Sequence, residues 1–280
     1  MTIASTAQPR PHLVVGSQLI RHWEPEGAVA AEVVLVHGLA EHSGRYERTG
    51  ALLAASGLEV TAPDLVGFGA TGGRRGHVED WAQFLDQVEA LVGAAEETGR
   101  PVVLMGHSMG ALIALEYALS ERPDPDLLVL SAPALSGGAG WQRAVAPILA
   151  RLAPKLKIPN RLKGEQLSRD PAVGEEYFAD PLVYTSSTAR LGAELFAAID
   201  RTRSALSSLS VPTYVLHGGM DSIVPPTSTV KLGALPGVER HLHPTLRHEV
   251  LNEPEGPELV AAIADWILAR VGSGSLDVDD

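Results

Sequence analysis

Short, largely apolar runs recur along this chain, and stretches of helical periodicity lie between them. Such runs are typical of strands that are buried on both faces of a sheet. They fall at residues 33–36, 58–62, 102–105, 127–130 and 213–216. Residues 13–20 alternate more loosely and predict an edge hairpin strand, and residues 239–243 predict a short strand near the end of the chain.

Between these runs, large apolar side chains are spaced three and four residues apart, which is typical of amphipathic helices. One set precedes the run at 102–105 and another lies near the C-terminus: Trp81, Phe84, Leu85, Val88 and Val92, then Leu259, Ile263, Trp266 and Ile267. Alternating strands and helices predict an α/β fold with a mostly parallel central sheet and helices on both faces.

The alternation stops between about Pro133 and Leu209, a stretch that has five prolines in its interior and no run typical of a buried strand. Helical spacing persists there at Val145, Ile148, Leu149, Leu152 and Leu156. We therefore expect a core formed by residues 1–134 and 206–280, with a helical cap at residues 135–205 inserted into it.

Composition narrows the classes of function. The 280 residues carry a formal net charge of −12, which argues against nucleic acid and against stable binding to an anionic membrane surface. Because the chain has no cysteine, disulfides, thiolate metal sites and a thiol nucleophile are excluded.

The ends of the chain and its longest apolar runs bear on location. Residues 1–10 have no apolar core and predict a short disordered arm, not a signal peptide. The glycine, serine and acidic residues of 272–280 predict a frayed tail. No apolar run approaches the roughly 20 residues that a membrane span needs. We expect a cytoplasmic protein without stable membrane insertion.

The most informative motif is Gly106-His107-Ser108-Met109-Gly110, a G-x-S-x-G pattern between a predicted strand and a small-residue helical run. A sharp strand-to-helix turn of this kind exposes the serine hydroxyl as a nucleophile. The flanking glycines let the strained turn form and let the helix pack close to the strand. Ser108 is therefore the predicted nucleophile.

A serine nucleophile needs a base, and the base needs a residue that orients it. Asp221 follows the run at 213–216, and His248 follows the strand at 239–243. The order Ser, Asp, His is that of the α/β-hydrolase fold. Two alternatives stay open: Asp221 as a turn-capping residue and His248 as a packed loop histidine. His241 and His243 have metal-like spacing but no third ligand, so no metal is predicted.

The negative charge that develops during acyl transfer needs backbone N–H groups aimed at it. One is expected from Met109, which follows the nucleophile. The other is expected from Leu39, in the glycine turn after the run at 33–36.

At these residues the chain resembles the monoacylglycerol lipase family of α/β-hydrolases, which is grouped with lysophospholipase-like serine hydrolases. The resemblance covers roughly residues 12–270 and rests on motifs in the core and in the cap. They lie at 37–46, 106–110, 131–134, 167–171, 179–184 and 248–254.

The resemblance implies hydrolysis of monoacylglycerols to glycerol and a fatty acid without a cofactor. It also implies an acyl tunnel under the cap and a polar glycerol end near Glu41 and Arg45, which fit a loop-bracing pair equally well. Ile148 and Leu149 fit the wall of that tunnel, a lid in transient contact with lipid, or ordinary cap packing.

One loop departs from the family. Relatives carry Asp-x-Arg-Gly-His-Gly-x-Ser after the second core strand, where this chain has Val66 in place of the Arg and Phe68 in place of the His. The change removes a charged anchor and makes the loop more apolar, with consequences for its rigidity and for the range of substrates.

Two further classes of function remain. The same residues would also cleave a substrate with another leaving group: a lysophospholipid, a peptide amide, or a compound with a scissile carbon–carbon bond. The fold would also serve as a binding module for a partner or a lipid without catalysis. The sequence leaves the acyl chain length and the oligomeric state undetermined.

Overall fold

The computed structural model describes residues 13–15 and 18–272. The predicted N-terminal arm at 1–10 lies outside the described residues, as does the predicted tail beyond Gly272. Within the described part, no helix has the length and the apolar character needed to cross a bilayer.

Eight strands of the described chain form one sheet, in the order β1-β2-β4-β3-β5-β6-β9-β10. Their bounds are β1 Leu13–Val15, β2 Gln18–Trp23, β3 Ala31–Val36, β4 Leu58–Pro63, β5 Val102–His107, β6 Leu127–Ser131, β9 Thr213–Gly218 and β10 Val238–His243. The pairs from β4 through β10 are parallel, whereas β1–β2 and β2–β4 are antiparallel. The mostly parallel sheet predicted from the sequence is thus confirmed.

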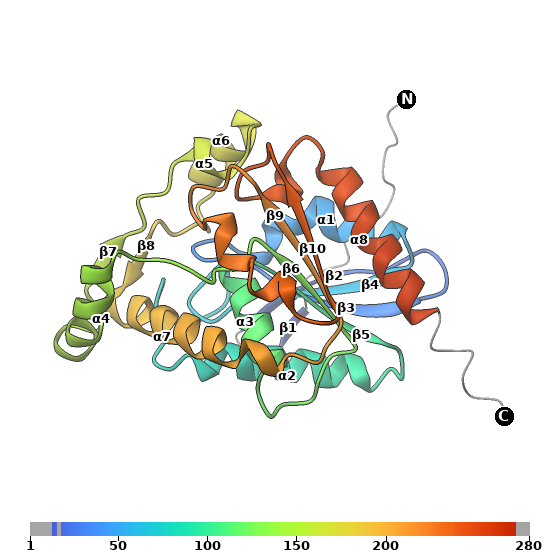
Figure 1. Cartoon of the computed structure of the whole chain (residues 1–280), viewed down its shortest axis with the longest axis horizontal. Coiled ribbons are helices and arrows are strands. Elements are labelled where there is room, and N and C mark those ends of the chain that lie inside the picture. The colour runs from blue at the N-terminus through green and yellow to red at the C-terminus, as the bar shows by residue number, and fades with distance from the viewer. Residues whose placement is uncertain (1–12, 16–17, 273–280) are drawn as a thin grey trace.

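Helices cover both faces of this sheet (Figure 1). One face carries α2 (Ala82–Glu96), α3 (Met109–Ala118) and α7 (Ala189–Ala205), and the other carries α1 (Glu47–Ala55) and α8 (Gly256–Val271). Apolar side chains pack between the sheet and each helical layer, so that β3, β5 and β6 are buried on both sides. This double burial explains why these strands are continuously apolar.

Short 3-10 helices complete the core. They are η1 (Ser43–Tyr46), η2 (Leu206–Ser208), η3 (Pro226–Thr229), η4 (Leu232–Ala234) and η5 (Val250–Asn252). The N-terminal prediction differs in detail from the structure: the single edge strand expected at 13–20 is two antiparallel strands, with Val15 paired to Gln18. In the sequence the two strands are separated by Gly16-Ser17, a dipeptide typical of a two-residue hairpin turn, which the loose alternation alone does not identify.

The segment at 135–205 contains α4 (Gly140–Leu152), α5 (Gly164–Leu167), α6 (Pro171–Ala179) and a small antiparallel pair, β7 (Lys157–Pro159) with β8 (Ser186–Thr188). In Figure 1 these elements lie to one side of the sheet. The last helix of the segment, α7, buries Leu191 and Ile199 against the core. The cap boundaries at 135 and 205 stay a prediction.

Candidate active site

The motif around Ser108 forms a sharp turn between β5 and α3. Ser108 has φ 52° and ψ −113°, a left-handed backbone that is strained for a residue with a side chain. A Cβ on Gly106 would lie 2.4 Å from the carbonyl oxygen of Gly110, and a Cβ on Gly110 would lie 2.1 Å from the carbonyl oxygen of Val36. Both positions therefore require glycine, because the helix passes so close to the strands.

The structure brings Ser108, His248 and Asp221 into one hydrogen-bonded row. The Ser108 Oγ atom lies 2.9 Å from His248 Nε2, and His248 Nδ1 lies 2.7 Å from Asp221 Oδ2. Three strands supply these side chains from their carboxyl ends: β5 directly, β9 through its following turn, and β10 through its following loop. Residues 140 positions apart thus meet at one edge of the sheet, as ligand sites of open α/β sheets do.

Asp221 is buried and fully hydrogen-bonded. Its Oδ1 atom accepts the backbone N–H groups of Ile223 (2.8 Å) and Val224 (2.9 Å), and these two hydrogen bonds close the turn that follows Asp221. Burial alone would raise the pKa of this carboxyl, but hydrogen bonds from His217 and His248 outweigh it and hold the pKa well below its ordinary value. The residue is ionised at neutral pH and faces the imidazole as a carboxylate.

The two amides expected to bind an oxyanion lie beside Ser108. Met109 is the first residue of α3, so its N–H has no acceptor within the helix. Leu39 follows Gly38, where a Cβ would come within 3.4 Å of the Ser108 Cβ atom, and it lines the pocket over the serine. Across the described chain, neither amide donates to another protein group.

Two buried histidines shape the walls of the site. His37 accepts the Leu65 amide at Nε2 (2.9 Å) and donates from Nδ1 to its neighbouring carbonyl oxygen at Gly38 (2.8 Å), and burial lowers its pKa. Burial and the adjacent His248 lower the pKa of His107 to about 4. Both rings are therefore neutral at pH 7 and hold loops in place without adding charge.

The loop that departs from the family is anchored by an aromatic ring. Phe68 is buried, lies edge-on to His37 with ring centroids 5.7 Å apart, and packs against Phe84. Val66 packs against the same apolar cluster, and its amide donates to Gln87 Oε1 (2.8 Å). Apolar packing thus replaces the charged anchor.

Glu41 and Arg45 form the centre of a buried ionic network. The Glu41 carboxylate accepts the Gly38 amide (2.6 Å), the Tyr46 hydroxyl (2.7 Å) and the Arg45 guanidinium (2.5 Å). Burial would raise the pKa of Glu41, but the Arg45 charge outweighs it and lowers the pKa to about 2. The guanidinium also pairs with Glu249, so Arg45 braces loops, and of the two predicted substrate contacts only Glu41 lines the pocket.

The pocket over Ser108 is a cavity of about 70 Å³. Its walls combine core and cap residues: Gly38, Leu39, Glu41, His107, Ser108, Leu162, Leu167, Tyr177, Ile223, His248 and Glu249. Ile148 and Leu149 do not line it. They belong to α4, where Ile148 is 58% exposed.

Sequence reasoning missed four apolar or aromatic wall residues, namely Leu162, Leu167, Tyr177 and Ile223. Leu167 opens one of the cap motifs, and Tyr177 precedes the other by two residues, so both were within reach of the motif evidence. The Tyr177 hydroxyl is buried and has no hydrogen-bond partner among the residues that the structure describes.

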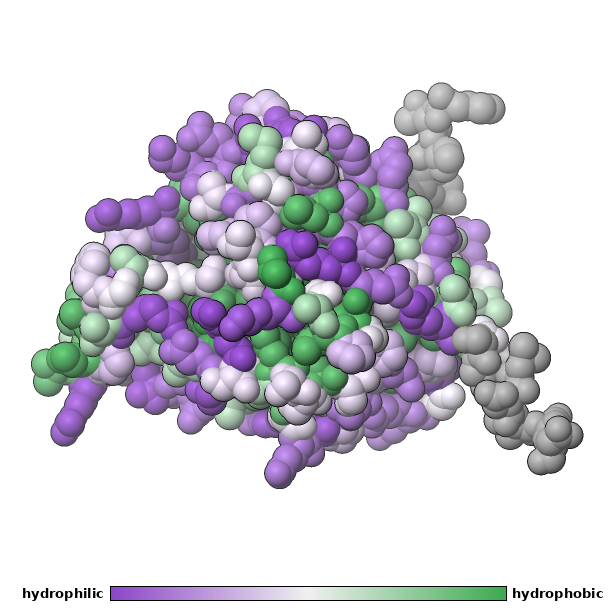
Figure 2. Space-filling view, viewed as in Figure 1, coloured by the Kyte–Doolittle hydropathy of each residue, from purple (hydrophilic) through white to green (hydrophobic). Residues whose placement is uncertain are grey.

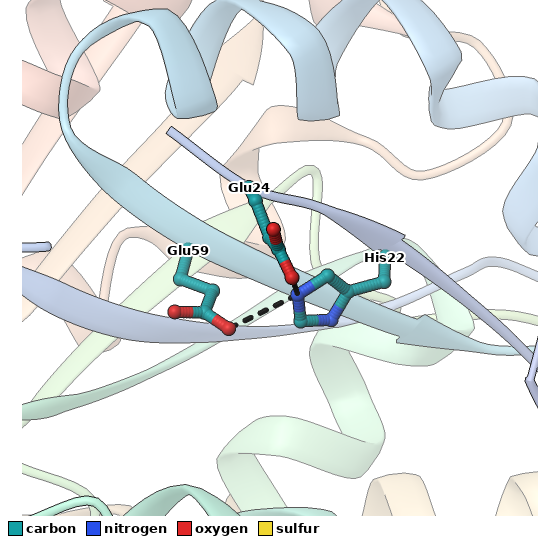
Figure 3. Close-up of side chains that lie close together, drawn as sticks. All are labelled: His22, Glu24 and Glu59. Atoms are coloured by element: carbon teal, nitrogen blue, oxygen red, sulfur yellow. Dashed lines mark ion pairs between the residues drawn. The ribbon is translucent and has the colours of Figure 1, made fainter. Parts of the chain in front are cut away.

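Among the described residues, one group of side chains has the spacing of a metal site, at His22, Glu24 and Glu59 (Figure 3). His22 Nε2 lies 3.0 Å from Glu59 Oε1 and 3.4 Å from Glu24 Oε1. Glu59 is also paired with Arg100. These contacts make an ion-pair cluster, and none of its residues lines the pocket.

His241 is one of the two histidines with metal-like spacing in the sequence. Its ring stacks on the ring of Tyr214.

A parallel sheet between two helical layers, with a serine at its strained turn and a histidine and a carboxylate behind it, defines a serine hydrolase of the α/β-hydrolase fold. The family model described as "Serine aminopeptidase, S33" matches residues 27–255. The chain belongs to this family, and the resemblance to its monoacylglycerol lipases is confirmed by the relatives below.

The chain is 33% identical to the monoacylglycerol lipase of Mycolicibacterium smegmatis over 96% of its own length and all of that protein. It is 31% identical to phospholipase YtpA of Bacillus subtilis, covering 86% of this chain and 95% of that one. The crystal structure of the Paleococcus ferrophilus monoacylglycerol lipase superposes with a TM-score of 0.83 at 30% identity, over 90% of this chain and 98% of that one.

Proposed function

We propose that this enzyme hydrolyses monoacylglycerols to glycerol and a free fatty acid, with Ser108 as nucleophile, His248 as base and acid, and Asp221 as the residue that orients His248. The observation that carries the proposal is the Ser108–His248–Asp221 row at the floor of a pocket that is partly walled by the cap. The similarity to monoacylglycerol lipases over nearly the whole chain supports this choice of substrate.

In the acylation half, Ser108 Oγ attacks the ester carbonyl carbon while its proton moves to His248 Nε2. The amides of Leu39 and Met109 stabilise the oxyanion that forms. As the tetrahedral intermediate collapses, the ester C–O bond breaks and His248 gives its proton to the departing glycerol oxygen. The fatty acyl group stays on Ser108, and Asp221 stabilises the imidazolium while it lasts.

Deacylation repeats these steps with water as the nucleophile. His248 takes a proton from the water, which attacks the acyl carbonyl, and then returns that proton to Ser108 Oγ as the fatty acid leaves. The ester supplies the acyl group in the first half and one water molecule completes the second, so both halves balance.

The walls of the pocket suit a ligand with one polar and one apolar end. Glu41 and the buried Tyr177 hydroxyl offer hydrogen bonds to glycerol, whereas Leu162, Leu167 and Ile223 offer an apolar surface. A cavity of about 70 Å³ is well below the roughly 300–1,000 Å³ of typical small-molecule sites. We infer that the cap moves to admit a long acyl chain.

The outer face of α4 is proposed to touch the lipid surface from which substrate is drawn. It exposes Trp141 (69%), Ile148 (58%) and Leu152 (77%), and Figure 2 shows apolar residues gathered over this end of the molecule. A helix with such a face lies in a membrane interface without spanning it. The contact is transient, because the chain carries a net charge of −12.

A lysophospholipid is the second candidate substrate, favoured by the similarity to a phospholipase over 86% of the chain. Turnover of matched C8, C12 and C18 monoacylglycerols, a diacylglycerol and a lysophospholipid separates the two, with Ser108→Ala as the blank. The proposal requires a clear preference for monoacylglycerols that Ser108→Ala abolishes. Preference for the phospholipid keeps the mechanism and replaces the substrate, and activity that survives in Ser108→Ala overturns the mechanism.

A further inference from the structure

His217 is a fully buried histidine at the end of β9, four residues before Asp221. The structure places its Nε2 atom 3.1 Å from Asp221 Oδ2 and 3.0 Å from the backbone oxygen of Val224. A second imidazole therefore contacts the carboxylate that orients His248.

The hydrogen-bond partners of His217 fix which of its nitrogens carries the hydrogen. An ionised carboxylate oxygen and a backbone carbonyl both accept hydrogen bonds and cannot donate them. Nε2 therefore donates, shared between Asp221 and Val224. On the other side, Nδ1 faces the Thr229 hydroxyl at 3.4 Å. The same Thr229 oxygen accepts a hydrogen bond from Arg240 Nε at 2.8 Å.

Asp221 Oδ2 consequently receives two imidazole N–H groups, from His248 at 2.7 Å and from His217 at 3.1 Å. Oδ1 receives two backbone amides. Four donors on two oxygens leave the carboxylate no freedom to rotate, so that Oδ2 stays aimed at His248 Nδ1.

Resting on the triad proposed above, we infer that His217 is a positioning residue of the hydrolytic site: its Nε2–H holds the Asp221 carboxylate in place and keeps the Asp221–His248 pair free of an extra proton at mildly acidic pH. The physical reason is charge sharing. A donor that stabilises the carboxylate lowers the proton affinity of the pair, whichever of its two members takes the proton. Removing the donor makes the pair take up a proton at higher pH.

Other charged and titratable groups face this pair and stay constant in the test. The His107 ring lies tilted against the His248 ring, with ring centroids 4.8 Å apart. Arg240 approaches from β10 through Thr229. Because neither is altered by a substitution at position 217, a change in the acid limb of the pH profile reports the donor at that position.

The experiment compares His217→Gln with His217→Met, two side chains of similar length and shape of which only Gln has an N–H donor. The readout is the rate at which a fluorophosphonate labels Ser108 between pH 4.5 and 8. In that reaction the Ser108 Oγ–P bond forms, the P–F bond breaks, fluoride leaves and the serine proton passes to His248. The readout does not depend on which ester is the natural substrate.

We expect the acid limb to move up by about one pH unit in His217→Met, because the charged pair loses one hydrogen-bond donor; one unit corresponds to 1.36 kcal/mol. At pH values below the acid limb, Ser108 is therefore expected to be labelled about tenfold more slowly in His217→Met than in the wild type. His217→Gln keeps the wild-type limb. If His217→Met does not fold, His217→Asn replaces it, because its shorter amide ends near the position of Nδ1 and does not reach Asp221.

An unchanged acid limb in a folded variant without the donor means that His217 only packs, and overturns the inference. An equal shift in both variants does the same, because the donor is then irrelevant. Failure of the wild-type enzyme to be labelled at Ser108 is a different result. It contradicts the proposed triad itself.

Discussion

Arg45 and Glu249 form a bidentate ion pair, with Nη1–Oε1 at 2.7 Å and Nη2–Oε2 at 2.8 Å. Glu249 directly follows His248. Arg45 lies in η1, which follows the loop that carries Leu39. The pair therefore joins the loop of His248, the proposed base, to the loop of Leu39, a proposed oxyanion donor. Arg45 also lies 4.8 Å from the centre of the Tyr177 ring, which brings the cap into the same cluster.

Replacing Arg45 by Met is expected to lower the free energy of unfolding by about 3–5 kcal/mol, because it leaves the buried carboxylates of Glu41 and Glu249 without their counter-charge. Arg45→Lys keeps a charge but loses the bidentate geometry, so its free energy of unfolding is expected to lie between those of Arg45→Met and the wild type. Denaturant unfolding measures both variants. The control is Arg122→Ala, which breaks ion pairs with the exposed carboxylates of Asp86 and Glu89 and costs no more than about 1 kcal/mol for each. Equal effects for Arg45→Met and Arg122→Ala contradict the structural role.

Glu41 predicts how stability depends on acid. Its pKa is about 2 in the folded protein, against an ordinary value of 4.5. A depressed folded pKa gives stability that is complete above the unfolded value and is lost as pH falls from about 4.5 through 2. Glu41→Gln is less stable at pH 7 because the ion pair is gone, but its unfolding free energy falls less steeply over this window. Parallel curves for the two proteins argue against the depressed pKa.

The strained turn at Ser108 could be predicted because its requirements are local. Two glycines, a preceding strand and a following helix lie within a few residues of one another in the sequence. The order of Ser108, Asp221 and His248 along the chain then indicated which carboxylate and which histidine meet the serine, since parallel strands bring their carboxyl ends to one edge.

The cap could not be predicted at the same level, because which of its residues face the serine depends on how it docks. Ile148 and Leu149 have the spacing of a buried helical face, yet Ile148 is exposed. Periodicity identifies an apolar face but does not say what covers it. The pair of Arg45 with Glu249 spans 204 residues and had no signature in the sequence.

The exposed face of α4 predicts a difference between dispersed and membrane-bound substrate. The triple variant Trp141→Ser, Ile148→Ser, Leu152→Ser removes apolar area from the surface and leaves the pocket intact. Hydrolysis of monoacylglycerol in neutral vesicles is expected to fall about tenfold or more, at roughly 1.5–3 kcal/mol for each large side chain that enters the interface. Hydrolysis of a dissolved short-chain ester stays at the wild-type rate. A loss on both substrates points to damage inside the cap rather than to surface contact.

Tyr177 gives the sharpest test of the glycerol end of the pocket. Within the described part of the chain its buried hydroxyl has no partner, so Tyr177→Phe removes no hydrogen bond seen there and leaves the stability unchanged or slightly raised. If the hydroxyl binds glycerol, KM for monoacylglycerol rises about fivefold to tenfold, as expected for one neutral hydrogen bond of about 1–1.5 kcal/mol. The matched ethyl ester has no glycerol hydroxyl groups, and its KM stays constant. An equal rise for both esters assigns Tyr177 to the shape of the pocket alone.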